Sequence, residues 1–376
     1  MNVSEFRKCV ASMTDKQLEF LLLNLARQGA AAPPKEAAVQ PAPKKAKGLL
    51  PGSILEEMET LRAAVRRRSG GLDAEHMKWL RTCETLQNLP RKECLFQGAS
   101  DLEVYQRLKA LSQEKCLPES LSRAILGQLM AYLETGSMRP VLMVGEPGCG
   151  KTTAAQYLAE LLGLPCYKVS APKASTSHGL SGETRSYRGA DAGEPVQAML
   201  TTGIQNPVLI FDEVDKITRT THSAQLDDEL LSVCDGARDI WDNFVGCRFD
   251  LSACPVFMTA NELERVSEPL RDRCLVIRFP EVDLPRLHRI MERYTVSKLR
   301  TYHGRVHVGP SVVEALTENL YRKGVRSIRQ HQKLVDNVLD NAYFKALEGE
   351  NAQITAENAL WAVEEITAAK KKTVGF

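Results

Sequence analysis

The chain has 376 residues, of which 43% are hydrophobic and 26% are charged. A fibrous or wholly disordered protein does not have this composition, and one hydrophobic core rarely serves so long a chain, so we expect a soluble protein of two or three domains. Lysine and arginine total 49 against 47 acidic residues, and the resulting charge of +2 is too small for general binding of nucleic acid over the whole surface.

Cysteine spacing and hydropathy bear on the compartment. The ten cysteines form no CxxC pair and no metal-like spacing, and no secretory signal precedes them. The apolar run Phe20–Leu23 near the start is too short to cross a membrane. We therefore expect a cytoplasmic protein with reduced thiols and no membrane role.

Residues 1–29 are predicted to form a short helical N-terminal segment. Thr14 and Gln17 make a capping-box pattern, and Gly29 stands where a helix would end. A segment of this size cannot bury its stripe of leucines alone. Packing within a helical hairpin and docking on a partner or another subunit both explain the stripe.

The next two segments differ in composition. Residues 30–53 contain five prolines, many alanines and several lysines, which predicts an extended linker. Residues 54–114 show helical periodicity with many charges and are interpreted as a helical neck. The linker lysines and the run Arg66–Arg68 would suit nucleic acid, although a solvated linker and an exposed helix end explain them better.

Residues 115–284 alternate helical stretches with short apolar runs at 140–144, 207–211, 255–259 and 274–279, each bounded by turn formers or polar residues. This alternation predicts an α/β domain, a parallel sheet with helices on both faces. Helical spacing returns in residues 285–376, which are interpreted as a small helical lid domain.

A phosphate-binding pattern follows the apolar strand predicted at Val141–Val144. It matches G-x-x-x-x-G-K-[ST] and comprises Gly145, Glu146, Pro147, Gly148, Cys149, Gly150, Lys151 and Thr152, with Thr153 leading into a helix. The glycines let successive N–H groups face the phosphates, Lys151 reaches the β and γ oxygens, and Thr152 holds Mg²⁺. These nine residues are the predicted ATP-binding residues, and the α/β domain is expected to be a P-loop NTPase.

Two adjacent carboxylates end a second apolar strand. Asp212 and Glu213 follow Val208–Phe211, about sixty residues after the P-loop. At the carboxyl end of a strand, Asp212 can hold Mg²⁺ through water, while Glu213 can orient and deprotonate the attacking water. We therefore predict a hydrolase in which Asp212 serves the metal and Glu213 is the general base.

Two further elements would complete the chemistry. Asn261 follows the strand Val256–Thr259 and would place a neutral amide beside the γ-phosphate, which makes it a candidate sensor. The segment that follows offers Arg271 and Arg273, either of which could stabilise transition-state charge on the ATP of a neighbouring subunit.

From about residue 75 to its end, the chain resembles the ATPase module of Lon proteases, within the AAA+ superfamily. The most specific segments are GETRSYRGA at 182–190, DEVDK at 212–216, TAN at 259–261, EPLRDR at 268–273 and GVR at 324–326. The resemblance implies a ring, usually of six subunits with ATP at each interface, Arg273 as the finger acting in trans and Arg326 in the lid as sensor 2. It also implies that Tyr187 lines a central pore, where an aromatic ring can pack on side chains of any sequence.

The chain departs from this family in three places. Arg188 stands where the pore loop commonly has an apolar residue, which favours an acidic or nucleic-acid substrate. Lys115–Pro118 replaces a segment with an aromatic residue that usually flanks adenine. The chain ends at Phe376 without a domain for the Ser-Lys proteolytic dyad, and residues 1–53 replace the large N-terminal domain, so we expect no protease activity of its own.

The favoured function is that of an ATP- and Mg²⁺-dependent AAA+ motor that remodels or unfolds a protein partner. Arg188 and the basic segments keep open a nucleic-acid-handling ATPase in defence or DNA maintenance. A nucleotide-gated scaffold with slow turnover is the third hypothesis.

Overall fold

The structure is a computed structural model of the chain. It describes residues 49–66, 74–95, 99–174, 179–217, 221–236, 238–302, 305–349, 353–357 and 359–373. The helical segment predicted over residues 1–29 and most of the linker predicted over 30–53 lie outside the described residues, as do Arg67 and Arg68.

The chain divides into two compact units, which are considered one at a time. The first contains residues up to 111 with 119–144 and 152–278, and the second contains 112–118, 145–151 and 279–376. The short segments 112–118 and 145–151 thus group with the C-terminal helices. The five-part domain division given by the sequence stays a prediction.

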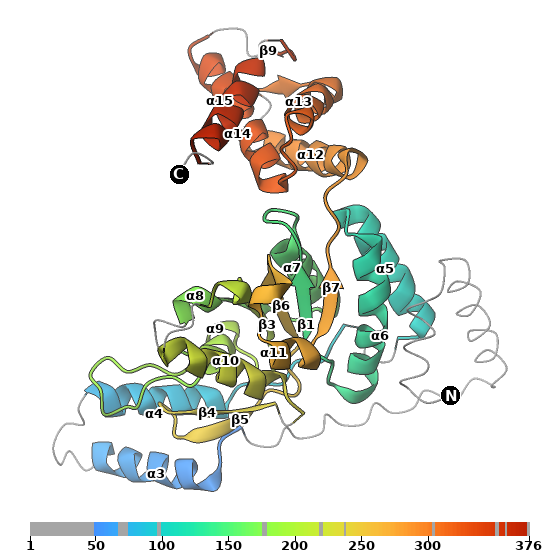
Figure 1. The fold of residues 1–376 in the computed structure, drawn as a ribbon. Helices are drawn as coiled ribbons and strands as arrows, with labels where there is room; N and C mark the ends of the chain where they lie inside the picture. Colours follow the sequence, from blue (N-terminus) through green and yellow to red (C-terminus); the bar gives the residue numbers. More distant parts are fainter. Residues whose placement is uncertain are drawn as a thin grey trace, which may run out of the picture. The chain divides into compact units, whose positions relative to one another are not determined.

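A five-stranded parallel sheet forms the centre of the first unit (Figure 1). Its order is β2-β3-β6-β1-β7, with β2 at Cys166–Ser170, β3 at Val208–Asp212, β6 at Val256–Ala260, β1 at Val141–Val144 and β7 at Leu275–Arg278. Every residue of β1 and β6 is buried, as expected for central strands of a parallel sheet covered by helices. The predicted parallel α/β architecture is confirmed.

Three described strands of the first unit were not predicted. In the edge strand β2 only Val169 is fully buried, so its apolar signal is weak. The other two, β4 (Asp239–Asp242) and β5 (Cys247–Asp250), form an antiparallel hairpin whose residues alternate between buried and more exposed. Such alternation is typical of a strand with one covered face.

Helices surround this sheet. They are α3 (Gly52–Arg66), α4 (Ala74–Gln87), α5 (Asp101–Lys115), α6 (Glu119–Thr135), α7 (Lys151–Leu162), α8 (Ala171–Ala174), α9 (Glu194–Thr202), α10 (Thr221–Cys234) and α11 (Glu268–Arg273), with 3-10 turns η1 (Val214–Lys216) and η2 (Leu263–Arg265). Among the helices that the structure describes, none has the length and hydropathy needed to cross a membrane.

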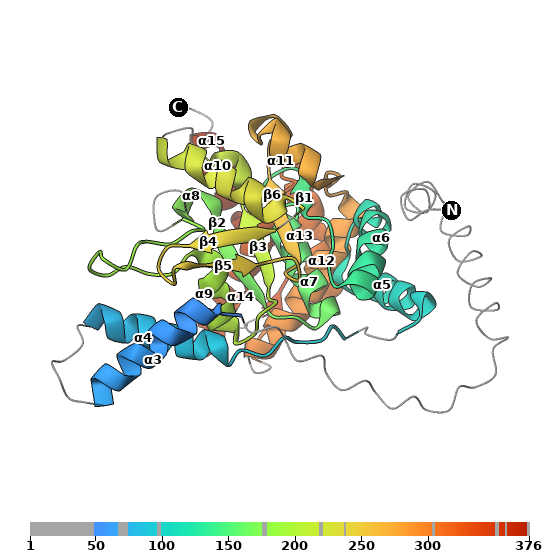
Figure 2. The same cartoon turned by 90° about the horizontal axis from the view of Figure 1, so that it is seen from below.

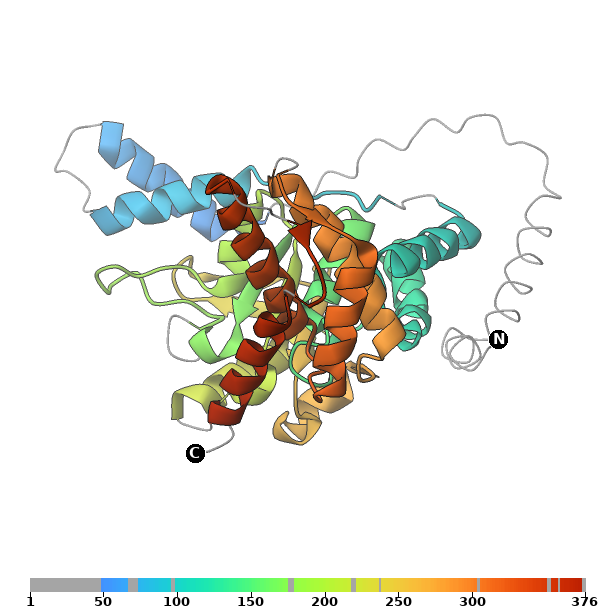
Figure 3. The same cartoon turned by 90° about the horizontal axis from the view of Figure 1, so that it is seen from above.

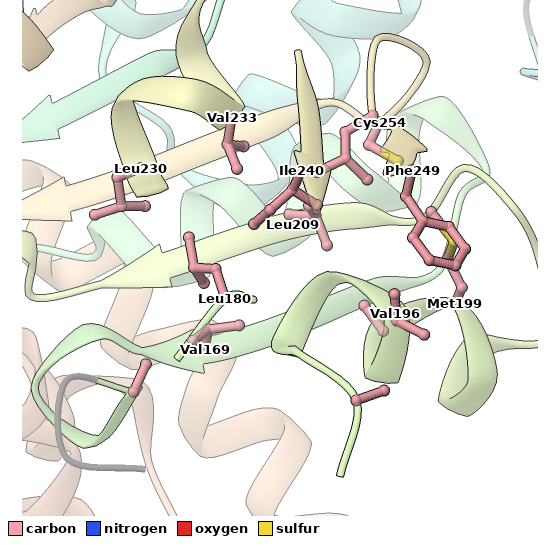
Figure 4. Close-up of a cluster of buried hydrophobic side chains, with 14 of the residues drawn as sticks. Val169, Leu180, Val196, Met199, Leu209, Leu230, Val233, Ile240, Phe249 and Cys254 are labelled. Carbon is pink, nitrogen blue, oxygen red and sulfur yellow. The ribbon is translucent and has the colours of Figure 1, made fainter. Parts of the chain in front are cut away.

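The core of the first unit includes the sheet, the hairpin and the helical pair α3–α4. Val169 and Leu209 of neighbouring strands belong to the same buried cluster as Met199 of α9 (Figure 4). Met58 of α3 and Trp79 of α4 are fully buried in this cluster too. Figure 2 shows the pair beside the hairpin β4–β5. The part of the predicted neck that forms α3 and α4 is therefore packed into the first unit.

The C-terminal part of the second unit is helical, as predicted (Figure 3). It comprises α12 (Leu284–Leu299), η3 (Arg300–Tyr302), α13 (Pro310–Arg322), α14 (Ile328–Leu347) and α15 (Leu360–Thr373), and it adds a two-stranded parallel pair, β8 (His307–Val308) with β9 (Gln353–Ile354), that was not predicted. Helix α12 begins after Asp283, whose side chain accepts a hydrogen bond from the Arg286 N–H at 2.7 Å, an N-cap contact.

Candidate functional site

The predicted acid pair and the predicted sensor lie at one edge of the sheet. Asp212 is the last residue of β3 and Glu213 follows it, while Asn261 follows β6, the neighbour of β3. Parallel strands end at the same edge, where open α/β sheets bind their ligands. The structure therefore brings these three residues together, and their catalytic roles stay predictions.

Asp212 links the two predicted metal residues. Its Oδ1 accepts hydrogen bonds from the Thr152 hydroxyl at 2.8 Å and from the Thr259 hydroxyl, and its Oδ2 pairs with the Lys168 ammonium at 2.6 Å. Burial alone would raise the pKa of Asp212, but the hydrogen bonds from Lys168, Thr259 and Thr152 outweigh burial and lower it. Asp212 is thus held as a carboxylate at neutral pH.

The oxygens of Thr152 and Asp212 fit Mg²⁺. This ion usually takes one or two protein oxygens and completes its octahedron with water and phosphate oxygens. A hydroxyl and a carboxylate 2.8 Å apart provide such a pair. The roles of Thr152 and Asp212 as metal ligands stay predictions.

Two further residues contribute to this site: Lys168, which the sequence did not single out, and Thr259, which was named only as part of the TAN segment. Lys168 is an exposed residue of β2, and β2 pairs with β3 so that Ser170 lies opposite Asp212. The Thr259 hydroxyl also accepts a hydrogen bond from the Glu213 N–H at 3.0 Å. A lysine in a short strand and a threonine two residues before Asn261 were the available signals.

Glu213 has an unusual backbone and an ionic partner. Its φ of 61° lies in the left-handed region, which few non-glycine residues adopt and which is often retained at functional sites. Its Oε1 pairs with the Lys216 ammonium at 2.6 Å, and both side chains are partly exposed. Glu213 must exchange this partner for water before it can act as a base.

The P-loop residues 145–151 belong to the second unit. Gly148 and Gly150 have φ angles of 78° and 97°, a conformation that glycine adopts without strain. The buried Lys151 ammonium donates to the carbonyl oxygens of Gly145 at 2.6 Å and of Glu146 at 3.1 Å. A turn of this kind with a buried cation suits an anion such as a phosphate group.

The N-terminus of α14 packs against the P-loop within the second unit. The Ile328 N–H donates to the Gly148 carbonyl at 2.9 Å, and a Cβ at Gly148 would lie 2.1 Å from the Ser327 Oγ. Close by in sequence, Arg326 has its guanidinium 3.5 Å from the centre of the Tyr321 ring and donates to the Tyr321 carbonyl at 2.6 Å. Its role as sensor 2 stays a prediction.

Both finger candidates lie on α11. Arg273 contacts Asp235 at 3.4 Å and donates to the Pro269 carbonyl at 3.1 Å. The buried Nε of Arg271 has no hydrogen-bond partner among the described residues. The choice between the two as finger stays open, because the structure contains one chain.

The predicted pore residues lie on the loop between α8 and α9. Tyr187 is 67% exposed, and Arg188 is exposed beside it. The N–H of Tyr187 donates to the Thr184 carbonyl at 3.0 Å, and the Ala190 N–H donates to the Tyr187 carbonyl at 3.2 Å. These turns give the loop a defined shape and leave the aromatic ring accessible.

Comparison with known proteins supports the likeness to AAA and Lon ATPases that the sequence motifs indicate. Residues 141–281 match the family described as ATPase family associated with various cellular activities (AAA). The mitochondrial Lon protease homolog of Mus musculus is 29% identical over 273 residues, which cover 70% of this chain and 28% of the mouse protein. That of Phaeodactylum tricornutum is 32% identical over 246 residues, with 61% and 28% covered.

One solved structure has a partial likeness in shape. A point mutant of RuvB from Thermotoga maritima matches with a TM-score of 0.45 and 18% sequence identity, covering 65% of this chain and 69% of that chain.

The P-loop, the acid pair and Asn261 all fall within residues 141–281, the region that matches the AAA domain. Around this domain the chain is related to the ATPase module of Lon proteases, at about 30% identity. The chain spans only 28% of the length of each of these two relatives.

Proposed function

We propose that this chain is an ATP- and Mg²⁺-dependent motor that hydrolyses ATP and uses the resulting motion to remodel or unfold a protein partner. The contact between Thr152 and Asp212, 2.8 Å long, carries the ATPase part of the proposal. It places a hydroxyl from the start of α7 and a carboxylate from the end of β3 within reach of one divalent ion.

Each residue of the proposed reaction has a defined task. Lys151 and the N–H groups of the P-loop hold the phosphates. Glu213 releases Lys216 and takes a proton from the attacking water, and Asn261 orients that water. Mg²⁺ would neutralise charge on the phosphate oxygens when bound.

A ring is part of the proposal, because AAA and Lon relatives support an assembly in which a neighbour can supply an arginine. Arg273 is our choice for this finger. Its contact with Asp235 is long and 36% of its own side chain is exposed, so the guanidinium can exchange partners. A ring of six subunits in the cytoplasm is proposed, and the free thiols of the described cysteines support a reducing compartment.

Tyr187 supports a protein substrate. A flat ring that is 67% exposed can pack on many kinds of side chain without sequence preference. Arg188 beside it keeps nucleic acid as the second candidate, because a guanidinium can also contact phosphates or stack on bases.

The test measures ATPase activity alone, with an unfolded protein and with single- or double-stranded DNA. We expect stimulation by the unfolded protein, and a loss of turnover of at least about 100-fold for Lys151→Ala and for Glu213→Gln. Full-rate turnover of Glu213→Gln would exclude Glu213 as the base. Stimulation by DNA alone would favour the nucleic-acid alternative.

A further inference from the structure

The loop that carries Tyr187 and Arg188 is fastened to the helical pair α3–α4. On the N-terminal side of the two residues, the Arg185 guanidinium lies 4.8 Å from the centre of the Trp79 ring and pairs with Glu57 at 2.7 Å. Trp79 lies on α4 and Glu57 on α3, so one arginine joins the loop to both helices.

A second attachment follows directly on the C-terminal side. The Gly189 N–H donates to the Glu75 carboxylate at 3.0 Å. The Lys78 ammonium donates to the Ala190 carbonyl at 2.6 Å and pairs with Asp191 at 2.6 Å. Both Glu75 and Lys78 are on α4, so this helix holds three consecutive residues of the loop.

The base of the loop is held by the hairpin turn between β4 and β5. The N–H of Asn243 donates to the Ser181 carbonyl at 2.7 Å, and its amide group donates to the Gly182 carbonyl at 3.1 Å. The fully buried Asp242 accepts a hydrogen bond from the Gly193 N–H at 2.8 Å. Both ends of the loop are therefore fixed at the same turn.

Trp79 joins α4 to that turn. Its ring is fully buried, its Nε1 donates to the Val245 carbonyl at 3.2 Å, and its face receives Arg185. Next to it, the Lys78 ammonium lies 5.6 Å from the centre of the Phe244 ring. The loop, α4 and the turn thus share one set of contacts, and Figures 1 and 2 show the three side by side.

These attachments leave Tyr187 and Arg188 exposed between two fixed points. A binding group that is already ordered loses less conformational entropy when it takes a ligand, and its ligand-binding geometry is defined by the residues that support it. The supporting residues here are separated from the loop by more than 100 positions in the sequence. Neither Glu75 nor Lys78 belongs to the buried core, and 38% of the Lys78 side chain is exposed.

We propose that Glu75 and Lys78 of α4 are positioning residues for Tyr187 and Arg188, and that α4 and the loop act as one part when a protein substrate is gripped. This inference rests on the proposed function. Glu75 and Lys78 act through the backbone of Gly189 and Ala190 and the side chain of Asp191, and they do not touch the substrate.

The experiment uses the full chain with Glu75→Ala and Lys78→Ala combined. Hydrogen exchange of the peptide spanning residues 182–192 should become about tenfold faster, the effect of losing about 1.4 kcal/mol of local protection. The concentration of unfolded protein that half-stimulates the ATPase should rise by about tenfold, and the maximal stimulated rate should change much less.

Two further variants serve as controls. Glu84→Gln removes the ion pair of Glu84 with Arg62, which joins α3 to α4 at 2.9 Å without involving the loop, and should leave both readouts within about twofold of the original chain. Glu75→Gln combined with Lys78→Arg keeps an acceptor for Gly189 and a donor for Ala190, and should restore most of both readouts.

Unchanged exchange in residues 182–192 for the alanine pair would overturn the positioning role, as would equal effects from Glu84→Gln. If the alanine pair lowers thermal stability globally, the comparison moves to Glu75→Ala alone, and unchanged exchange there overturns it as well. A further outcome is that hydrogen exchange of residues 182–192 speeds up in the variant while the ATPase of the chain does not respond to unfolded protein. That result would support the anchoring and contradict the proposed function.

Discussion

Asp212 at the end of β3 and Asp242 at the end of β4 both accept several hydrogen bonds, yet their pKa values move in opposite directions. Burial raises the pKa of Asp242 to about 6, although the backbone N–H groups of Val245, Gly193 and Phe244 lower it in part. At Asp212 the effect of burial is also the largest single one, but the lysine and hydroxyl donors together exceed it.

The nature of the partners explains this difference. Asp242 has no exposed surface and only neutral backbone donors, so its charge is poorly compensated. Asp212 keeps 17% of its side chain exposed and has Lys168 as a cationic partner. One carboxylate is thus arranged to stay charged, and the other to hold a turn and a loop together.

The largest expected effect comes from Asp212→Asn. The amide cannot replace the carboxylate as a charged ligand, so ATP turnover should fall by at least about 100-fold, corresponding to about 3 kcal/mol of lost charge stabilisation. A steady-state ATPase assay measures the turnover, and a thermal melt checks that the variant is folded. Turnover above a tenth of the original rate would show that Asp212 does not serve the metal.

Asp242→Ala tests the other aspartate. Removing its carboxylate leaves buried N–H groups of Gly193 and Val245 without acceptors, which should cost about 3 kcal/mol of unfolding free energy. Urea unfolding followed by circular dichroism measures this loss. A stability within about 0.5 kcal/mol of the original chain, the size of effect expected of a surface substitution, would contradict the role assigned to Asp242.

The pH dependence of stability should show the sign of the Asp242 shift. The folded-state pKa of about 6 lies above the ordinary value of 3.8, so the folded state binds the extra proton between these values. Stability from this group is fully present below the lower value and is lost as the pH rises through 6, by about 3 kcal/mol in all. The unfolding free energy of the original chain minus that of Asp242→Asn should therefore decrease from about pH 4 to about pH 6 and then stay level. A difference that grows over this range would mean that the pKa is lowered.

The smallest effect is expected from Lys168→Met. Without its ammonium partner the pKa of Asp212 should rise, because a nearby cation favours the carboxylate. The acidic limb of the ATPase pH profile should then move to higher pH, with little change at about pH 8. An unmoved acidic limb would indicate that the hydroxyl donors alone keep Asp212 charged.

The fold was predictable where burial is two-sided. The runs at 141–144, 208–211 and 256–258 are continuous apolar segments, and each one is an inner strand of the sheet. The predicted run at 274–279 contains the edge strand β7. The edge strand β2 and the hairpin β4–β5 were not predicted, because each presents polar residues on one side. Short apolar runs mark buried strands best, and partly exposed strands depend on tertiary contacts.

The candidate site also has one part that local sequence patterns predict and another that only the folded structure shows. The P-loop and the acid pair are local patterns, so residues such as Lys151 and Asp212 could be named from spacing alone. Lys168 reaches Asp212 from another strand, and Lys78 reaches Ala190 across 112 positions. No local pattern predicts such pairs, because only the folded arrangement brings them together.

The hydrogen bond from the Ile328 N–H to the Gly148 carbonyl has a thermodynamic consequence. Any ligand that changes the P-loop so as to strengthen or weaken this bond changes the stability of the N-terminus of α14. Linkage between two binding events is reciprocal. If the ligand changes the affinity of α14 for a binding partner by some factor, that partner changes the affinity of the P-loop for the ligand by the same factor. A displacement of α14 would then change the affinity for the nucleotide.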